Sequence, residues 1–143
     1  MFKHILLPTD GSELSNAAIQ SGIAFAKSIN AKVTGLSVIV PSHTLMLSPE
    51  MLGTHQEEYY EDSRIQAESY LAVIERTAHE AGVACDTAYV TAPLAYEAII
   101  KVAEQQGCDL ILMASHGRKG VQGLLIGSET AKVLTHTDRK SVV

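Results

Sequence analysis

Hydrophobic positions along this chain fall into blocks that alternate between two kinds of spacing. Four short blocks are almost continuously apolar or rich in β-branched residues, which is typical of strands buried on both faces of a sheet: Lys3–Pro8, Ala31–Val40, Val83–Thr91 and Asp109–Ser115. A last block, Ser141–Val143, has room only for the stub of a further strand.

The blocks between the expected strands have apolar residues at helical spacing. The first helix is expected to begin after Ser12, a good N-cap, and to stop at Asn30, which tolerates a left-handed backbone. Its expected apolar positions are Leu14, Ala17, Ala18, Phe25, Ala26 and Ile29.

Three further helices are expected. A long helix over Glu57–Gly82 has an acidic start, and a shorter one over Pro93–Gly107 has Pro93 in its first turn. A last helix runs from about Gly127 to His136, whereas Pro41–Gln56 lacks a period and is expected to form a loop that either covers a site or simply connects two elements. The apolar stripe of the long helix includes Ile65, Leu71, Val73, Ile74 and Ala78.

Strands and helices thus alternate along the whole sequence, which predicts an α/β fold. We expect one domain over residues 1–143, built on an open parallel sheet of five strands in the order 3-2-1-4-5 with helices on both faces. In that order strands one and four are neighbours. The helices that follow them leave on opposite faces, so a crevice opens at their carboxyl ends, where ligands bind.

Composition and charge exclude several classes of partner. The formal net charge is −5 without any basic run, which argues against nucleic acid because a phosphate backbone requires a clustered cationic surface. No apolar segment approaches the length that spans a bilayer, and Pro8 and Asp10 interrupt the first one too early for a signal peptide. Cys85 and Cys108 are isolated, and two free, buried thiols suit a reducing compartment. We therefore expect a cytoplasmic protein with neither membrane nor nucleic acid as a partner.

Two polar stretches follow the strands that border the expected crevice. Pro8–Ser12 follows the first strand, and the glycine-rich stretch Met113–Lys132 follows the fourth. A flexible glycine loop that leads into a helix N-terminus binds anions through backbone N–H groups, so we favour phosphate binding over a loop that merely bends. Arg118 and Lys119 either add positive charge there or are simply solvated. The glycines and hydroxyls concerned are Gly117, Gly120, Gly123, Gly127, Ser128 and Thr130.

Three common phosphate sites do not fit these residues. A Walker loop requires lysine and then serine or threonine after its last glycine, whereas Gly127 and Ser128 are followed by Glu129. The dinucleotide fingerprint is missing after the first strand. A receiver domain needs a phosphoacceptor aspartate after the third strand, which this sequence does not have there, so Asp10 does not belong to a site of that kind.

The segments KHILLPTDGSELSNAAI and DLILMASHGRKGVQGLLIGSETAKVLTH resemble the universal stress protein family. The resemblance extends over nearly the whole chain and is weakest in Pro41–Tyr60 and at the extreme C-terminus. The nucleotide-binding branch of that family has a glycine, two residues, a second glycine, nine residues and then Gly-Ser or Gly-Thr. Gly117 and Gly127-Ser128 match this pattern, while Ala114 replaces the first glycine and either crowds the phosphates or changes the loop path.

The resemblance implies a site for ATP or AMP. Asp10 would accept hydrogen bonds from the ribose hydroxyls, face a phosphate-bound Mg²⁺, or instead cap the first helix, and the sequence leaves these roles open. The resemblance places Pro8, Thr9 and Asp10 along the nucleoside, the backbone of Val38 at the adenine, Met113, Ala114, His116 and Gly117 at the ribose and the phosphate approach, and Gly127, Ser128, Glu129 and Thr130 at the phosphates.

Three functions are compatible with such a site: a nucleotide-binding stress-response regulator, a slow Mg-dependent ATP hydrolase, and an interaction scaffold without ligand. Hydrolysis needs a positioned metal, a group that orients water and usually a charge clamp. The sequence offers only Asp10, His116 and Arg118 for these roles, and its histidines lack metal-ligand spacing. The retained Gly117 and Gly127-Ser128 argue against the scaffold. We expect a regulator that is not an enzyme.

Members of the family commonly form homodimers by pairing their final strands. Here the sequence ends in THTDRKSVV, which puts Asp138, Arg139 and Lys140 where an apolar edge strand is expected. Three strand residues per chain offer few backbone hydrogen bonds. We expect a homodimer that is either weaker than usual for the family or built on other surfaces.

Overall fold

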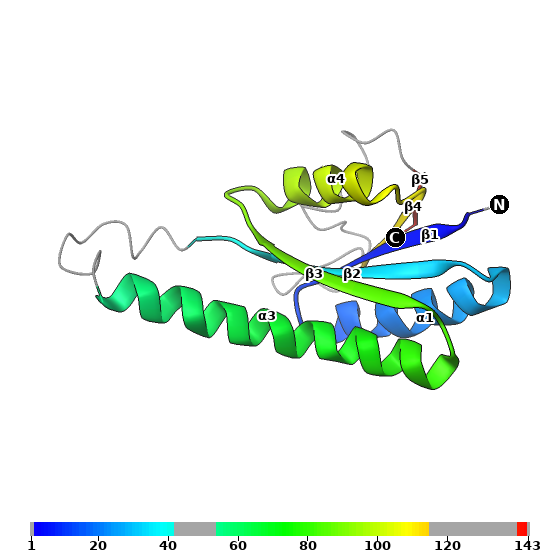
Figure 1. Cartoon of the computed structure of the whole chain (residues 1–143), viewed down its shortest axis with the longest axis horizontal. Coiled ribbons are helices and arrows are strands. Elements are labelled where there is room, and N and C mark those ends of the chain that lie inside the picture. Colours follow the sequence, from blue (N-terminus) through cyan, green and yellow to red (C-terminus); the bar gives the residue numbers. More distant parts are fainter. Residues whose placement is uncertain (1, 42–53, 115–139, 143) are drawn as a thin grey trace.

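The computed structural model describes residues 2–41, 54–114 and 140–142 of the 143-residue chain (Figure 1). Its elements are β1 (His4–Thr9), α1 (Glu13–Ile29), β2 (Lys32–Ile39), α3 (Thr54–Ala81), β3 (Cys85–Thr91), α4 (Ala95–Gln106), β4 (Leu110–Leu112) and β5 (Lys140–Val142). No helix within the described ranges is long and apolar enough to cross a membrane.

All strand pairs in the sheet are parallel, and the strand order is β3-β2-β1-β4-β5. The α/β class, the parallel sheet and the order of its first four strands are therefore confirmed. The C-terminal segment pairs three residues with β4, beginning at Lys140 rather than at Ser141.

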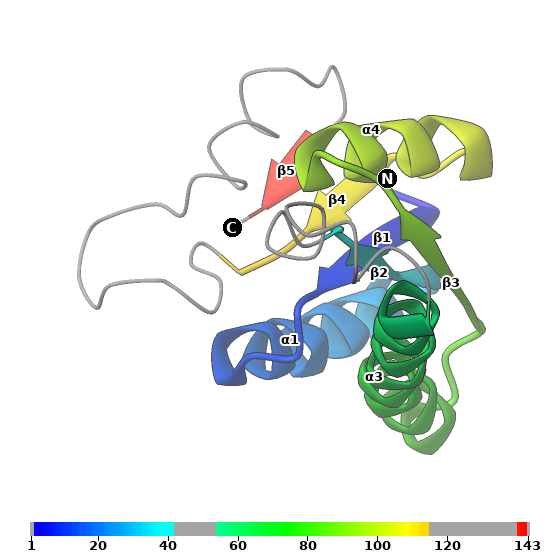
Figure 2. The same cartoon turned by 90° about the vertical axis from the view of Figure 1, so that its left-hand side faces the viewer.

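The sheet separates two apolar layers (Figure 2). α1 and α3 pack on one face, where Ile5 and Leu7 of β1 meet Ile19 and Ile74 of the helices. α4 packs on the other face, where Leu6 and Leu36 meet its buried residues Ile99, Val102 and Ala103. β1 is buried on both faces, as expected for the centre of a doubly covered parallel sheet.

The first helix is capped as predicted, and part of its predicted apolar face is confirmed, because Ala26 is buried and Ala18, Phe25 and Ile29 pack against the core. Ser12 accepts a hydrogen bond from the Ser15 N–H, and Asn30 has the left-handed conformation with φ 58°. Leu14, in contrast, is 48% exposed. Ser15 and Gly22 were overlooked because the stripe was sought among apolar side chains, whereas the helix packs closely on β1 through small residues. The buried positions are Ser15, Ile19, Gly22, Ile23 and Ala26.

The long helix α3 also differs from its prediction at its start. It begins at Thr54, inside the expected loop Pro41–Gln56, and Ile65 is 53% exposed rather than part of the apolar stripe. The side chains that α3 buries are Ala67, Leu71, Ile74 and Ala78. These four residues follow one another at spacings of three and four residues and so share one helix face. Ile65 is two residues before Ala67 and therefore points away from that face.

Two further expectations near β3 and α4 are corrected. The residues of β3 are half-buried or exposed and not buried on both faces, because β3 lies at the edge of the sheet, where the expected strand order had placed it. Pro93 lies before α4, whose N-cap is Leu94, so it is outside the first turn. The expected helix from Gly127 to His136 lies outside the described residues.

Candidate functional site

The carboxyl ends of β1, β2 and β4 lie at the same edge of the sheet, because these strands are parallel neighbours. Thr9 ends β1 and is buried, Asp10 follows it, and Met113 and Ala114 follow β4 half-exposed. The structure thus brings together Pro8, Thr9, Asp10, Val38, Met113 and Ala114 of the expected site. The other expected residues lie outside the described part of the chain: His116, Gly117, Gly127, Ser128, Glu129 and Thr130.

Asp10 holds the turn between β1 and α1 in shape. Its Oδ1 accepts a hydrogen bond from the Ser12 N–H at 2.9 Å and another from the Ser15 hydroxyl at 2.7 Å. The cap of α1 is Ser12, whose Oγ accepts from the Ser15 N–H at 3.1 Å. Asp10 therefore supports the helix start through Ser12 and Ser15, and it does not replace Ser12 as the N-cap.

Gly11 lets the same turn pass close to α3. Its backbone has φ +78°, and a Cβ built there would lie 2.3 Å from Cε1 of Tyr70. Both the left-handed backbone and the aromatic ring against it require glycine at this position. The ring of Tyr70 in α3 therefore packs directly against the turn that carries Asp10.

The sequence-based reasoning missed the contribution of α3 to this end of the sheet. Besides Tyr70 against Gly11, Tyr59 donates a hydrogen bond from its hydroxyl to the backbone carbonyl of Val40, just beyond β2, at 3.0 Å. Tyr59 and Tyr70 are eleven residues apart, close to three helical turns, so they share a helix face. That spacing between two of the three tyrosines of a largely polar helix was the available signal.

The backbone of Val38 faces the end of β1. The Ala92 N–H donates to the Ile39 carbonyl at 3.0 Å, so the backbone groups of Ile39 point toward β3. Successive residues of a strand direct their backbone groups to opposite sides, so those of Val38 point toward β1. The ladder between β1 and β2 has Thr9 opposite Ser37 as its last pair, which places Val38 level with the turn that carries Asp10.

At the amino end of β1, polar side chains form hydrogen bonds between neighbouring segments of the chain. The Asp109 carboxylate accepts from the N–H groups of Lys3 and His4 at 2.9 and 3.0 Å. Burial alone would raise the pKa of Asp109, but these backbone donors outweigh it and lower that pKa. Nε2 of His4 and Oγ1 of Thr34 form a buried hydrogen bond of 2.6 Å. Burial, and then the charge of Lys32, lower the pKa of His4 from its ordinary value of 6.5.

Neither cysteine has the properties of a reactive or metal-binding thiol. Cys108 is buried and Cys85 is half-buried, and neither forms a disulfide bond. Burial, with the carboxylates of Glu75 and Asp86, raises the pKa of the Cys85 thiol to about 11. Within the described ranges, no group of three or more histidine, cysteine or acidic residues is arranged to hold a metal ion.

A family model decides the wider relationship of the chain. The model of the universal stress protein family matches residues 1–143. This chain belongs to the universal stress protein family. Among related universal stress proteins is MJ0531 of Methanocaldococcus jannaschii, which is 31% identical over 134 residues that cover 94% of this chain and 76% of the relative.

Solved structures of universal stress proteins share the fold described above. The structure of MJ0577, from the same archaeon, superposes with a TM-score of 0.85 at 27% identity and covers 100% of this chain and 95% of its own. A universal stress protein crystallised in complex with cAMP superposes with a TM-score of 0.69 at 19% identity, over 99% of this chain and 95% of its own. The family and its fold are thus established for this chain.

Proposed function

We propose that this universal stress protein is a stress-response regulator that binds an adenine nucleotide, ATP or AMP, at the carboxyl ends of β1 and β4. The observation that carries the proposal is the convergence of Asp10, the Val38 backbone and Met113 at one edge of the sheet. Such an edge, where neighbouring strands of an α/β sheet send their helices to opposite faces, is where this class of fold binds ligands.

The residues at this edge suit a nucleoside. Val38 and Met113 pack on the α4-side apolar layer and offer a hydrophobic surface to a base, and the Val38 backbone offers hydrogen-bonding groups beside it. Asp10 stands at the end of β1 with its Oδ1 engaged by Ser12 and Ser15, so the orientation of its carboxylate is set before any ligand binds. A preorganised carboxylate is a suitable acceptor for ribose hydroxyls.

The phosphate part of the proposal rests on the sequence pattern. We place the phosphates at Gly127, Ser128, Glu129 and Thr130, approached past Ala114, His116 and Gly117, with a Mg²⁺ ion on the phosphates as an option. The related universal stress protein crystallised with cAMP supports an adenine nucleotide as the class of ligand. We propose that the nucleotide is a bound ligand and not a substrate, because the sequence pattern offers no evident general base beside the phosphates and the Asp10 carboxylate already serves the turn.

We extend the proposal to the setting of the domain. It would be a single cytoplasmic domain over residues 1–143, a homodimer, with the five-stranded sheet in the order 3-2-1-4-5 complete and β5 as its second edge. The nucleotide site does not depend on any of these features, so evidence against one of them would not contradict the proposed site.

The first experiment identifies the ligand directly. Mass spectrometry of material released from freshly purified, denatured protein should reveal ATP or AMP, and isothermal titration with each nucleotide, with and without Mg²⁺, should give its affinity. Gly127→Val should abolish binding without changing the unfolding transition, because a β-branched side chain would fill the space that phosphates need. Asp10→Asn should weaken binding, whereas the matched control Asp86→Asn, an exposed carboxylate on β3, should not.

The same preparations separate binding from catalysis. Phosphate release with Mg²⁺ should be absent or much slower than ligand exchange. Unchanged affinity in Gly127→Val would contradict the phosphate assignment. Rapid multiple turnover that is lost in Asp10→Ala would instead make the protein an ATP hydrolase.

A further inference from the structure

Within the described part of the chain, no strand or helix covers the outer edge of β3. The Val33 N–H donates to the Ala84 carbonyl and the Ala92 N–H donates to the Ile39 carbonyl, so even-numbered residues of this segment face β2. The backbone groups of the odd-numbered residues therefore point away from the sheet: Cys85, Thr87, Tyr89 and Thr91. Edge strands are normally shielded by lysine, proline, a bulge or a covering element. Across its seven residues, β3 has neither lysine nor proline.

A groove accompanies this edge along α3. One part, of about 560 Å³, lies between Glu68 and Leu71 of the helix and Thr87 and Tyr89 of the strand. It continues past Glu75 into a second part at Arg76 and His79. Tyr89 is 42% exposed beside it, so an aromatic side chain of good β propensity lies at this edge of the sheet.

We propose that the β3 edge and the outer face of α3 form a self-association surface for a second copy of this chain, with the two β3 strands antiparallel about a two-fold axis at Ala88. This register puts each outward-facing residue opposite another one: Cys85 opposite Thr91 of the partner subunit, and Thr87 opposite Tyr89 of the partner subunit. The only charged residue of β3, Asp86, then faces Val90 of the partner subunit, so no like charges meet.

The same two-fold axis would bring the two copies of α3 to the distance of packed helices. A two-fold axis perpendicular to the sheet keeps both copies of α3 on the same face of the continuous sheet that the two subunits would form. Since α3 packs about equally on β2 and β3, its axis lies between them. The two helices would then be separated by roughly two strand spacings, about 10 Å, which is close to the distance of packed helices.

The level of the axis on α3 follows from one hydrogen bond. Thr87 Oγ1 donates to Glu75 Oε1 at 2.8 Å, which puts these residues side by side. α3 runs antiparallel to β3 (Figure 1), and one strand residue of about 3.3 Å corresponds to about two helix residues of 1.5 Å. Ala88 is therefore level with Ala72 and Val73, and the small side chain of Ala72 lies where the helices approach most closely.

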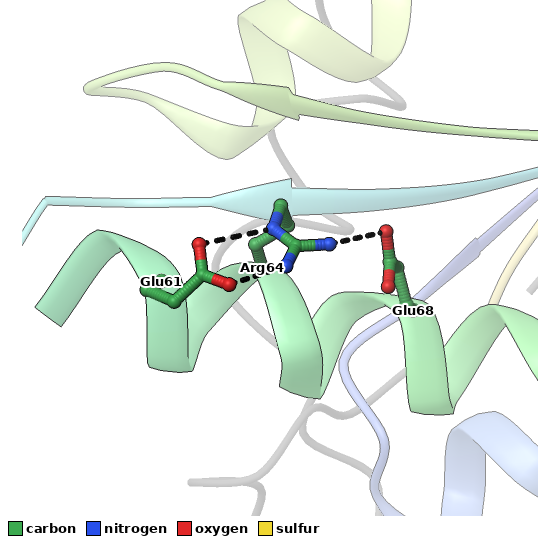
Figure 3. A network of polar contacts seen from close by, with 3 residues as sticks. All are labelled: Glu61, Arg64 and Glu68. Atoms are coloured by element: carbon green, nitrogen blue, oxygen red, sulfur yellow. Dashed lines mark hydrogen bonds and ion pairs between the residues drawn. The ribbon is translucent and has the colours of Figure 1, made fainter. Parts of the chain in front are cut away.

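Charges on α3 are complementary about that point. Glu68 and Arg76 lie four residues on either side of Ala72, so an antiparallel pair of helices places Glu68 opposite Arg76 of the partner subunit, and the reverse. Arg64 holds Glu61 and Glu68 on the same helix (Figure 3). Glu68 nevertheless keeps a side chain that is 52% exposed and able to accept a second cation. This reciprocity favours a second copy over an unrelated strand.

The test measures association of the full chain by light scattering and sedimentation over a dilution series. Tyr89→Pro removes an outward N–H without breaking the ladder to β2, so it should leave circular dichroism unchanged and shift the protein to monomer. Arg76→Glu should weaken association about tenfold or more, and the swap Glu68→Arg with Arg76→Glu should restore it. Lys101→Glu, an equal charge change on α4, is the matched control and should have no effect.

These variants also separate β3 pairing from pairing of the terminal strands. Deletion of Ser141–Val143 should leave β3 association intact. A wild-type chain that is monomeric at every concentration would overturn the proposal, as would a dimer insensitive to Arg76→Glu. If Tyr89→Pro fails to fold, the charge-swap pair decides alone: a double variant that associates no better than Arg76→Glu refutes the surface.

Discussion

The two ends of β1 use polar residues for different purposes. At the amino end, the Asp109 carboxylate accepts hydrogen bonds from the N–H groups of Lys3 and His4, and the His4 side chain is hydrogen-bonded to Thr34. These polar groups hold parts of the protein together. At the carboxyl end, Asp10 and Gly11 shape a turn that leaves Thr9 and Asp10 beside the ends of β2 and β4. Substitutions at the first end should therefore affect stability alone, whereas those at the second should affect stability and binding together.

Gly11→Ala should have the largest effect and should break both properties of the carboxyl end. A left-handed backbone and a Cβ at 2.3 Å from Tyr70 together should cost about 3 kcal/mol of unfolding free energy. The displaced turn should also reduce nucleotide affinity by at least about tenfold. Urea unfolding and calorimetric titration measure the two effects.

Gly82→Ala provides the matched control. Gly82 has φ +75°, nearly that of Gly11, but its nearest neighbour to a built Cβ is Lys27 Nζ at 3.7 Å. Only backbone strain remains, so we expect a loss of about 1 kcal/mol and unchanged affinity. Equal losses in the two variants would show that Tyr70 does not restrain the turn.

Asp109→Ala should separate the amino end from the site. Removing the acceptor for the Lys3 and His4 N–H groups should reduce the unfolding free energy by about 2 kcal/mol, as expected for hydrogen bonds to a charged group. Nucleotide affinity should stay the same because the site lies at the opposite end of the strands. A parallel loss of affinity would contradict the division between the two ends.

The smallest effect should be the pH dependence that His4 contributes. Since folding lowers the pKa of His4 from 6.5, the unfolded chain binds the proton first, and stability should fall as pH decreases below 6.5. One proton limits the slope to about 1.4 kcal/mol per pH unit. His4→Gln should flatten the stability profile between pH 7 and pH 5. The lowered pKa of Asp109 affects stability only below about its ordinary value of 3.8, so Asp109 does not contribute between pH 7 and pH 5. If the stability profile of His4→Gln equals that of the wild type, His4 is not the cause of the pH dependence.

The pattern of the sequence was sufficient for the α/β class, the parallel sheet and the order of its first four strands. Continuous apolar strands and the caps Ser12 and Asn30 identified the parallel sheet and the limits of α1 correctly. The exposed positions of β3 were missed because its apolar and β-branched residues are typical of a strand buried on both faces, although the expected strand order already placed this strand at an edge of the sheet.

The contribution of α3 to the site could not be predicted in the same way. Tyr59 and Tyr70 reach Val40 and Gly11 only because the helix lies across the ends of β1 and β2. Sequence distance hides such contacts, since Tyr70 is far along the chain from Gly11. The sequence placed Asp10 after the first strand, but the hydrogen bonds that its carboxylate accepts from Ser12 and Ser15 depend on the turn geometry and not on residue type.

The ring of Tyr70 against Gly11 gives the protein a built-in optical probe. The chain has five tyrosines and no tryptophan, so its intrinsic emission comes from tyrosine alone. Tyr70 touches the turn at the end of β1, and Tyr59 is bonded to the chain just beyond β2. Any rearrangement of that turn changes the surroundings of these phenols, so its kinetics are accessible to stopped-flow fluorescence and ultraviolet difference absorbance without an attached dye.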